Sequence, residues 1–193
     1  MISRYFLSLL LPLLTLSCAL PPTTPPLPTT VHAIAVLPPN NLTGDPLLIE
    51  SASFFHPDAA GPGRVTVPDV LAAEAQAQLE RCGFKVMTPE AVTTAIGHQA
   101  PASSEEAADL AARGQLEGSV LYIEIRRWDA DMAPTHPQRI LVALEARLID
   151  TVTGHAVWIA QLPLRPLPTL GALTRWRAYT IAARKVTEEL FAP

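Results

Sequence analysis

Apolar residues recur along this chain with two different periods, and together these periods predict one α/β domain. Residues 32–37 (HAIAVL) form a short apolar run that ends at two prolines, and residues 84–87 form a second short run. Runs of this length and composition are typical of buried strands. In residues 118–128 and 140–148 the apolar residues fall on alternate positions, so we expect two longer strands there.

Helical spacing is found in three segments between these strands. Residues 68–82 place an apolar residue on one face at about every fourth position, which predicts the first helix. A short second helix is expected over residues 89–96. Ser103 and Glu106 have the spacing of a capping box, which predicts a third helix that ends near Arg113.

The last third of the chain predicts a hairpin and a closing helix. Residues 150–154 (DTVTG) are typical of a turn, and a return strand begins at Val157, so the strands on either side should pair antiparallel. The predicted element order is β-α-β-α-α-β-β-β-α, a single α/β domain with a mixed sheet whose helices can cover one face. The closing helix is expected to bury Trp176, Tyr179, Ala183, Val186 and Leu190.

The first residues of the chain have the pattern of a lipoprotein signal peptide over residues 1–17. Arg4 supplies a positive charge, and the apolar stretch that follows is too short to span a bilayer as a helix. Residues 14–18 (LTLSC) resemble the bacterial lipobox, whose cysteine is lipidated, so Cys18 is the expected lipidation site. The alternative is an ordinary secretory leader that happens to contain a cysteine.

A proline-rich segment separates this leader from the predicted domain. Residues 18–31 contain the expected acylated cysteine and the run LPPTTPPLPTT, which favours polyproline II and predicts a semi-rigid tether. The α/β domain is expected over residues 32–193. Cys82, within that domain, is interpreted as a small core side chain.

Composition narrows the function mainly by exclusion. The formal net charge is −4, and 49% of the residues are hydrophobic, which excludes a disordered chain and argues against nucleic-acid binding. Residues 40–65 form a loop-like but partly apolar segment, in which Phe54 and Phe55 are candidates for partner contact. Arg126 and Trp128 are further candidates, because an arginine beside an aromatic is a common interface anchor; an arginine lying over a core tryptophan is the alternative.

Residues that could carry chemistry are not clustered in the sequence. The five histidines lack metal-ligand spacing, and the chain has neither a Gly-x-Ser-x-Gly motif nor a phosphate-binding glycine loop. We therefore expect no catalytic residue, no metal and no cofactor. An enzyme whose site residues are dispersed along the sequence is the least favoured of three hypotheses for the function.

Four segments resemble a known group of proteins. They are residues 34–46 (IAVLPPNNLTGDP), 83–89 (GFKVMTP), 118–125 (GSVLYIEI) and 146–158 (ARLIDTVTGHAVW). In this order they resemble the bacterial periplasmic lipoproteins of the CsgG/PelC/LpoB/TolB-amino-terminal-domain-like superfamily. The resemblance implies a periplasmic lipoprotein, held to a membrane by acyl chains on Cys18. Ala19, in place of an aspartate after the lipobox cysteine, is typical of lipoproteins sorted to the outer membrane, so the periplasmic face of the bacterial outer membrane is the expected location.

The anchor and the resemblance together lead to a function hypothesis. We expect a lipid-anchored, non-enzymatic envelope lipoprotein that acts by protein–protein contact in assembly, secretion or export, with an oligomeric ring as one form of such contact. The expected partners are the membrane and either an envelope protein or further copies of the chain, but not nucleic acid. The alternative is a periplasmic module that binds a small ligand or glycan between the long loop and the sheet.

Overall fold

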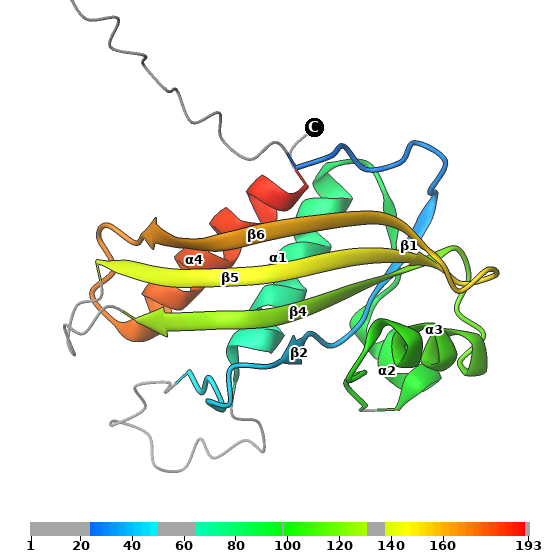
Figure 1. Ribbon diagram of the computed structural model, residues 1–193, viewed down its shortest axis with the longest axis horizontal. Coiled ribbons are helices and arrows are strands. Elements are labelled where there is room, and N and C mark those ends of the chain that lie inside the picture. Colours follow the sequence, from blue (N-terminus) through cyan, green and yellow to red (C-terminus); the bar gives the residue numbers. More distant parts are fainter. Residues whose placement is uncertain (1–23, 50–64, 98, 131–137, 192–193) are drawn as a thin grey trace, which may run out of the picture.

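The computed structural model describes residues 24–49, 65–97, 99–130 and 138–191 (Figure 1). The chain forms β1 (Ala33–Val36), β2 (Asn40–Asn41), α1 (Val67–Arg81), β3 (Lys85–Val86) and α2 (Pro89–Ile96). It continues through α3 (Ser104–Arg113), β4 (Ser119–Ala130), β5 (Arg139–Asp150), β6 (Ala156–Pro168) and α4 (Arg175–Leu190). The predicted order is confirmed, and the structure adds the two-residue strand β2 within the segment that the sequence predicted to be loop.

The strands form one mixed sheet in the order β3-β1-β4-β5-β6. β1 pairs in parallel with β3 and β4, whereas β4, β5 and β6 pair antiparallel, so the predicted hairpin is confirmed. β2 adds a short parallel pairing to β4 beyond the end of β1. β4, β5 and β6 are much longer than β1, so one half of the sheet extends well past the parallel part.

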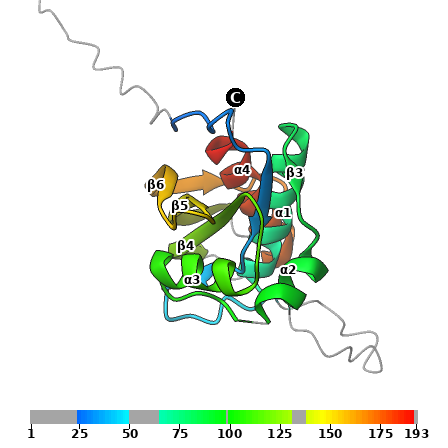
Figure 2. The same ribbon diagram turned by 90° about the vertical axis from the view of Figure 1, so that its right-hand side faces the viewer.

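Helices cover both faces of the sheet, but to different extents. The long helices α1 and α4 lie side by side against one face and bury the larger hydrophobic cluster with the sheet. A smaller cluster packs α2 and α3 against the opposite face, near β1 and the start of β4 (Figures 1 and 2). The expectation of helices on one face was therefore incomplete, because Tyr122 and Val120 on the second face are also buried.

Helix starts follow the capping chemistry of the sequence. Ser103 accepts a hydrogen bond from the backbone N–H of Glu106, and the Glu106 carboxylate accepts one from the N–H of Ala102. Thr66 and Asp69 form a full capping box at the start of α1. Because these side chains satisfy N–H groups that the helix leaves without partners, the predicted helix starts hold to within a residue or two.

The closing helix differs from its prediction at one position. Tyr179, Ala183, Val186 and Leu190 are buried as expected, but Trp176 is 45% exposed. Trp176 occupies the first turn of α4, at the margin of the buried stripe. The apolar period of a helix predicts only the direction in which a side chain points, not whether other residues cover it. The indole of Trp176 lies where the core beneath α4 ends.

The first described residues lie against the body of the domain. The indole Nε1 of Trp158 donates a hydrogen bond to the carbonyl of Pro25 at 2.7 Å, and Leu27 and Val31 pack against the larger core cluster. Trp158 also packs on Phe191, whose carbonyl accepts a hydrogen bond from the Cys82 thiol. The end of the proline-rich segment therefore meets the body beside β6 and the C-terminal end of α4.

Two glycines provide a matched test of the close approach between β1 and β4. Gly118 and Gly171 have nearly the same positive φ, +81° and +82°, but a Cβ on Gly118 would lie 2.5 Å from the carbonyl oxygen of Ala33, whereas Gly171 has nothing within 4 Å. We expect Gly171→Ala to lower the free energy of unfolding by about 1 kcal/mol, from the left-handed backbone alone. Gly118→Ala should cost roughly 3 kcal/mol, because the backbone of β1 must also move. Urea unfolding of both variants measures the difference, and equal losses would contradict the close packing of β1 on β4.

Candidate functional site

The face of β4, β5 and β6 that is turned away from α1 and α4 is covered by α3 only at one end (Figure 1). We call the remainder the open face. Its side chains come from alternate positions of the three strands, and Glu124 of β4, Glu145 of β5 and Gln161 of β6 lie in one cross-strand row. The strand register thus brings into one row residues that are far apart in the sequence.

Glu145 is at the centre of this row. It is only 3% exposed although it lies on the open face. Its Oε2 accepts hydrogen bonds from Arg126 at 2.7 Å and from Gln161 at 3.1 Å, and its Oε1 accepts one from Nε of Arg147 at 2.6 Å. The carboxylate is therefore covered by its own partners, and the solvation that it loses is compensated by two guanidinium groups.

Arg126 offsets the repulsion between two carboxylates that the strand register places side by side. Glu124 and Glu145 are directly opposite each other on adjacent strands, where like charges repel. One nitrogen of Arg126, Nη2, lies 3.2 Å from Glu124 and 2.7 Å from Glu145. With Arg147, the group has two carboxylates and two guanidiniums, and the Arg126 side chain stays half exposed at its surface. The open face thus presents an immobilised arginine.

The same network reaches the covered end of the face. Tyr122 donates a hydrogen bond to Glu124, and Asn40 of β2 donates to the Tyr122 hydroxyl and to the carbonyl of Ala102. Burial, opposed in part by the hydrogen bond from Asn40, raises the pKa of Tyr122 to about 12. The phenol is therefore a neutral donor at physiological pH, which suits a fixed hydrogen bond to Glu124 better than proton transfer.

A β-bulge determines which side chains of β4 reach the open face. Ile125 pairs with Leu144 and Arg127 pairs with Ala143, so Arg126 is one extra residue in β4. Because the bulge shifts the alternation by one position, Trp128 turns into the core and is 1% exposed. The side chains of the consecutive residues Arg126 and Arg127 are both half exposed or more, and Arg127 forms an ion pair with Asp129.

The interaction candidates of the sequence analysis therefore do not come together in one exposed site. Arg126 belongs to the ion-pair network, but the indole of Trp128 is not at the surface, so the two do not form an exposed pair. Cys18, Phe54 and Phe55 lie outside the described residues. Sequence reasoning missed Glu145 and Tyr122, and the signal that could have found them is a carboxylate and a phenol placed within long alternating strands.

Apolar side chains border the network on the edge strand. Val157, Ile159 and Leu164 of β6 are exposed, and Ile159 pairs directly with Arg147. The open face therefore combines a fixed charged centre with an apolar edge. Such a combination of arginine and aliphatic surface is typical of protein interfaces.

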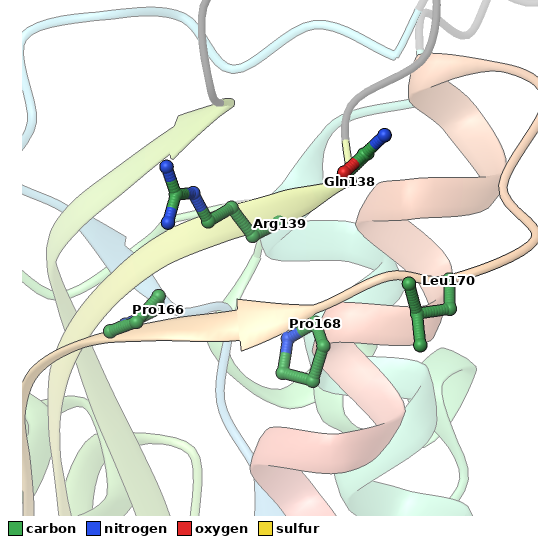
Figure 3. A pocket seen from close by; sticks show the side chains of 5 residues that line it. All are labelled: Gln138, Arg139, Pro166, Pro168 and Leu170. Atoms are coloured by element: carbon green, nitrogen blue, oxygen red, sulfur yellow. The ribbon is translucent and has the colours of Figure 1, made fainter.

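A shallow hollow of about 400 Å³ lies at the far end of the hairpin strands, away from α3 (Figure 3). Pro166 and Pro168 of β6 and Leu170 form its apolar lining, and Gln138 and Arg139 contribute its polar groups. Within the described ranges, no group of three His, Cys, Asp or Glu side chains could hold a metal ion. No described helix is both long and apolar enough to cross a membrane.

Several solved structures are similar to this chain at low sequence identity. No protein-family model and no curated protein sequence matches the chain. Similar solved structures include the PelC dodecamer from Paraburkholderia phytofirmans, at 19% identity and a TM-score of 0.44, covering 84% of this chain and 89% of that one. Lipoprotein GNA1162 from Neisseria meningitidis is 19% identical with a TM-score of 0.48, covering 79% and 94%.

The LpoB C-terminal domain from Salmonella enterica is also similar, at 12% identity and a TM-score of 0.39, covering 72% of this chain and 83% of that one. PelC and LpoB are two of the proteins that the four sequence segments resemble. At these identities and TM-scores the likeness is one of fold alone.

The central carboxylate can be tested by removing its charge alone. Glu145→Gln keeps the shape but leaves Arg126 and Arg147 without their shared counter-ion, so we expect a loss of about 2 kcal/mol in the free energy of unfolding. Asp129→Asn breaks the ion pair with Arg127, in which both side chains are well exposed, and should cost at most about 0.5 kcal/mol. Urea unfolding at neutral pH compares the two variants. Equal effects would show that the network is an ordinary surface ion pair.

The buried phenol predicts an alkaline dependence of stability. Because the pKa of Tyr122 is raised in the folded state to about 12, from an ordinary value near 10, its contribution is complete below pH 10 and is lost as the pH rises toward 12. Tyr122→Phe should therefore be less stable than the unmodified chain at pH 9, because it lacks the hydrogen bond to Glu124. The difference should shrink by on the order of 1 kcal/mol or more by pH 11.5, as measured by urea unfolding at both pH values. A difference that stays constant would contradict the raised pKa.

Proposed function

We propose that this protein is a lipid-anchored envelope lipoprotein that works without catalysis, by binding another protein through the open face of its sheet. The observation that carries this proposal is the half-exposed Arg126, held by Glu124 and Glu145 beside exposed aliphatic side chains of β6. A rigid arginine loses little conformational entropy on binding, and aliphatic neighbours supply area to bury.

The balance of charge on this face favours a protein partner. The carboxylates of Glu124 and Glu145 are already paired with arginines, so a partner need not supply cations to neutralise them. The exposed Arg126 side chain can donate to a carboxylate or a backbone carbonyl of a partner, while Ile159 and Val157 bury aliphatic surface. Assembly, secretion or export in the envelope, with a second copy or a different protein as partner, is the setting we propose.

The anchor in this proposal rests on the sequence. Residues 14–18 have the lipobox pattern, and acyl chains on Cys18 would tie the domain to a bilayer, because each buried methylene contributes about 0.8 kcal/mol. The outer membrane, on its periplasmic face, is the proposed location. Mass spectrometry of the amino-terminal peptide should show a mature chain that begins with an acylated Cys18, and an unmodified cysteine there would contradict the anchor.

The protein contact is tested by photo-cross-linking in cells. A photoreactive residue at Ile159 should give a discrete cross-linked product, because this side chain lies at the apolar border of the open face. The matched control is Val152, which is 90% exposed but lies in the turn between β5 and β6. A product of twice the chain mass identifies a second copy, and any other discrete mass identifies a different protein.

The substitution Arg126→Ala should reduce the yield of the Ile159 product several-fold, since a central interface arginine commonly contributes roughly 1–2 kcal/mol or more. A second probe at Phe54 tests the loop residue that the sequence singled out. Cross-linking at Ile159 that is no stronger than at Val152, or that Arg126→Ala leaves unchanged, would overturn the proposed interface.

A further inference from the structure

The connection between β6 and α4, together with the first turn of α4, exposes three large apolar side chains. Leu170 is 78% exposed, Leu173 is 65% exposed and Trp176 is 45% exposed, and they recur at every third position. We call these three residues the leucine–tryptophan patch. By contrast, the other two tryptophans, Trp128 and Trp158, are buried.

The patch is held in place by buried neighbours. Thr169 is buried, and its backbone N–H donates to the carbonyl of Gln138 at 2.8 Å. Ala172, between the two leucines, is also buried, and its N–H donates to the carbonyl of Thr169. The side chain of Thr174 caps α4 by accepting a hydrogen bond from the N–H of Arg177. The apolar side chains are thus presented by a fixed backbone.

The charges in the first turn of α4, beside the patch, are opposite in sign to those in the first turns of α1 and α3. α1 and α3 begin with acidic residues, which suit the positive end of a helix dipole, but α4 begins with Arg175 and Arg177 and has no acidic residue in its first turn. Two arginines at this end disfavour the helix, and a position that departs from a local stability rule is a candidate for function.

This basic character extends over a long stretch of an acidic protein. Residues 151–187 contain five basic residues and no aspartate or glutamate, although the whole chain has a net charge of −4. Arg165 and Arg184 of this stretch are engaged in ion pairs with Glu189 and Glu74. The charges of Arg175, Asp45 and Asp129 all influence the pKa of Tyr179, so these three side chains lie in the same region. Asp129 is itself paired with Arg127. Arg175 and Arg177, which flank Trp176 in the sequence, are both exposed.

We propose that the leucine–tryptophan patch docks on the surface of a lipid bilayer. Leu170, Leu173 and Trp176 would enter the boundary between headgroups and acyl chains, where tryptophan and leucine are favoured, while Arg175 and Arg177 bind lipid phosphates. Aliphatic and indole groups flanked by guanidiniums match the layered chemistry of this boundary. The proposal rests on the proposed function for the presence of a nearby membrane.

The position of the tether is consistent with this second membrane contact. The hydrogen bond from Trp158 fixes Pro25 near the start of β6, and the patch follows the end of the same strand (Figure 1). The ten residue-to-residue steps of strand from 158 to 168 span about 33 Å, and the six steps from Cys18 to Thr24 can reach about 20 Å. Contacts at both ends would lay the β6 edge along the bilayer and leave the open face of the sheet accessible.

The experiment uses the single exposed tryptophan as its probe. The mature full-length chain is reconstituted in vesicles of phosphatidylcholine and phosphatidylglycerol with or without bromine on the acyl chains. Bromine should quench the emission of Trp176, because it quenches indoles that enter the bilayer, whereas Trp128 and Trp158 are shielded by the protein. Trp176→Phe should abolish the bromine-dependent quenching and leave the remaining emission unchanged.

Variants of the flanking residues separate the two parts of the proposal. Leu170→Ser with Leu173→Ser should reduce the bromine-dependent quenching of Trp176 several-fold. Val152→Ser is the control, since it removes another highly exposed aliphatic side chain, in the turn between β5 and β6. Arg175→Gln with Arg177→Gln should abolish the dependence of quenching on phosphatidylglycerol. Circular dichroism checks that each variant keeps its fold.

The results distinguish this proposal from the anchor. A chain that stays with the vesicles through an acylated Cys18 but shows no quenching of Trp176 overturns the patch and leaves the anchor in place. Quenching in a chain whose Cys18 proves unmodified supports the patch and overturns the anchor. Trp176 shielded by a bound protein instead of lipid, shown by cross-linking from position 173, would overturn the membrane contact.

Discussion

The bulge at Arg126 is the constraint on which both faces of the sheet depend. It adds one residue to β4 opposite a single step of β5, so Ile125 and Trp128 both face α1 and α4. Strict alternation would direct Arg127 into that core and Trp128 onto the open face. An unpaired guanidinium in the core and an exposed indole would both be unfavourable. One inserted residue therefore closes the core and at the same time supplies the arginine that bridges Glu124 and Glu145.

The sequence predicts the parts of this fold that depend on local pattern. Apolar periods and capping residues such as Ser103 act over a few neighbours, so the helices, the long strands and the hairpin at 150–154 could be predicted. In that hairpin, Asp150 accepts hydrogen bonds from Thr153, as its turn chemistry predicts. The strand β2 could not be predicted in the same way, because two residues have no period and pair with β4 only after the sheet has formed.

The candidate site was less predictable because it depends on register. Arg126 could be singled out by its neighbour Trp128, but that neighbour is on the other face, and the residues that hold Arg126 are Glu124 and the distant Glu145. The row from Glu124 through Glu145 to Gln161 exists only when three strands align. The period of a helix also gives no information on where the core beneath it ends, which explains the exposed Trp176.

The two proposed contacts lie in different parts of the molecule, one on the open face of β4, β5 and β6 and the other just after the end of β6, and this separation has a physical basis. β6 is an edge strand, and its last part contains Pro163, Pro166 and Pro168, which lack N–H groups and so oppose the addition of another strand. Contacts at that end must therefore be made by side chains, as in the leucine–tryptophan patch. The face of the sheet is perpendicular to this edge, so Arg126 is presented to the side when the β6 edge follows a bilayer. A domain held at both ends of one edge would thus offer its charged centre in a fixed direction, which shortens the search for a partner that is confined to the same envelope.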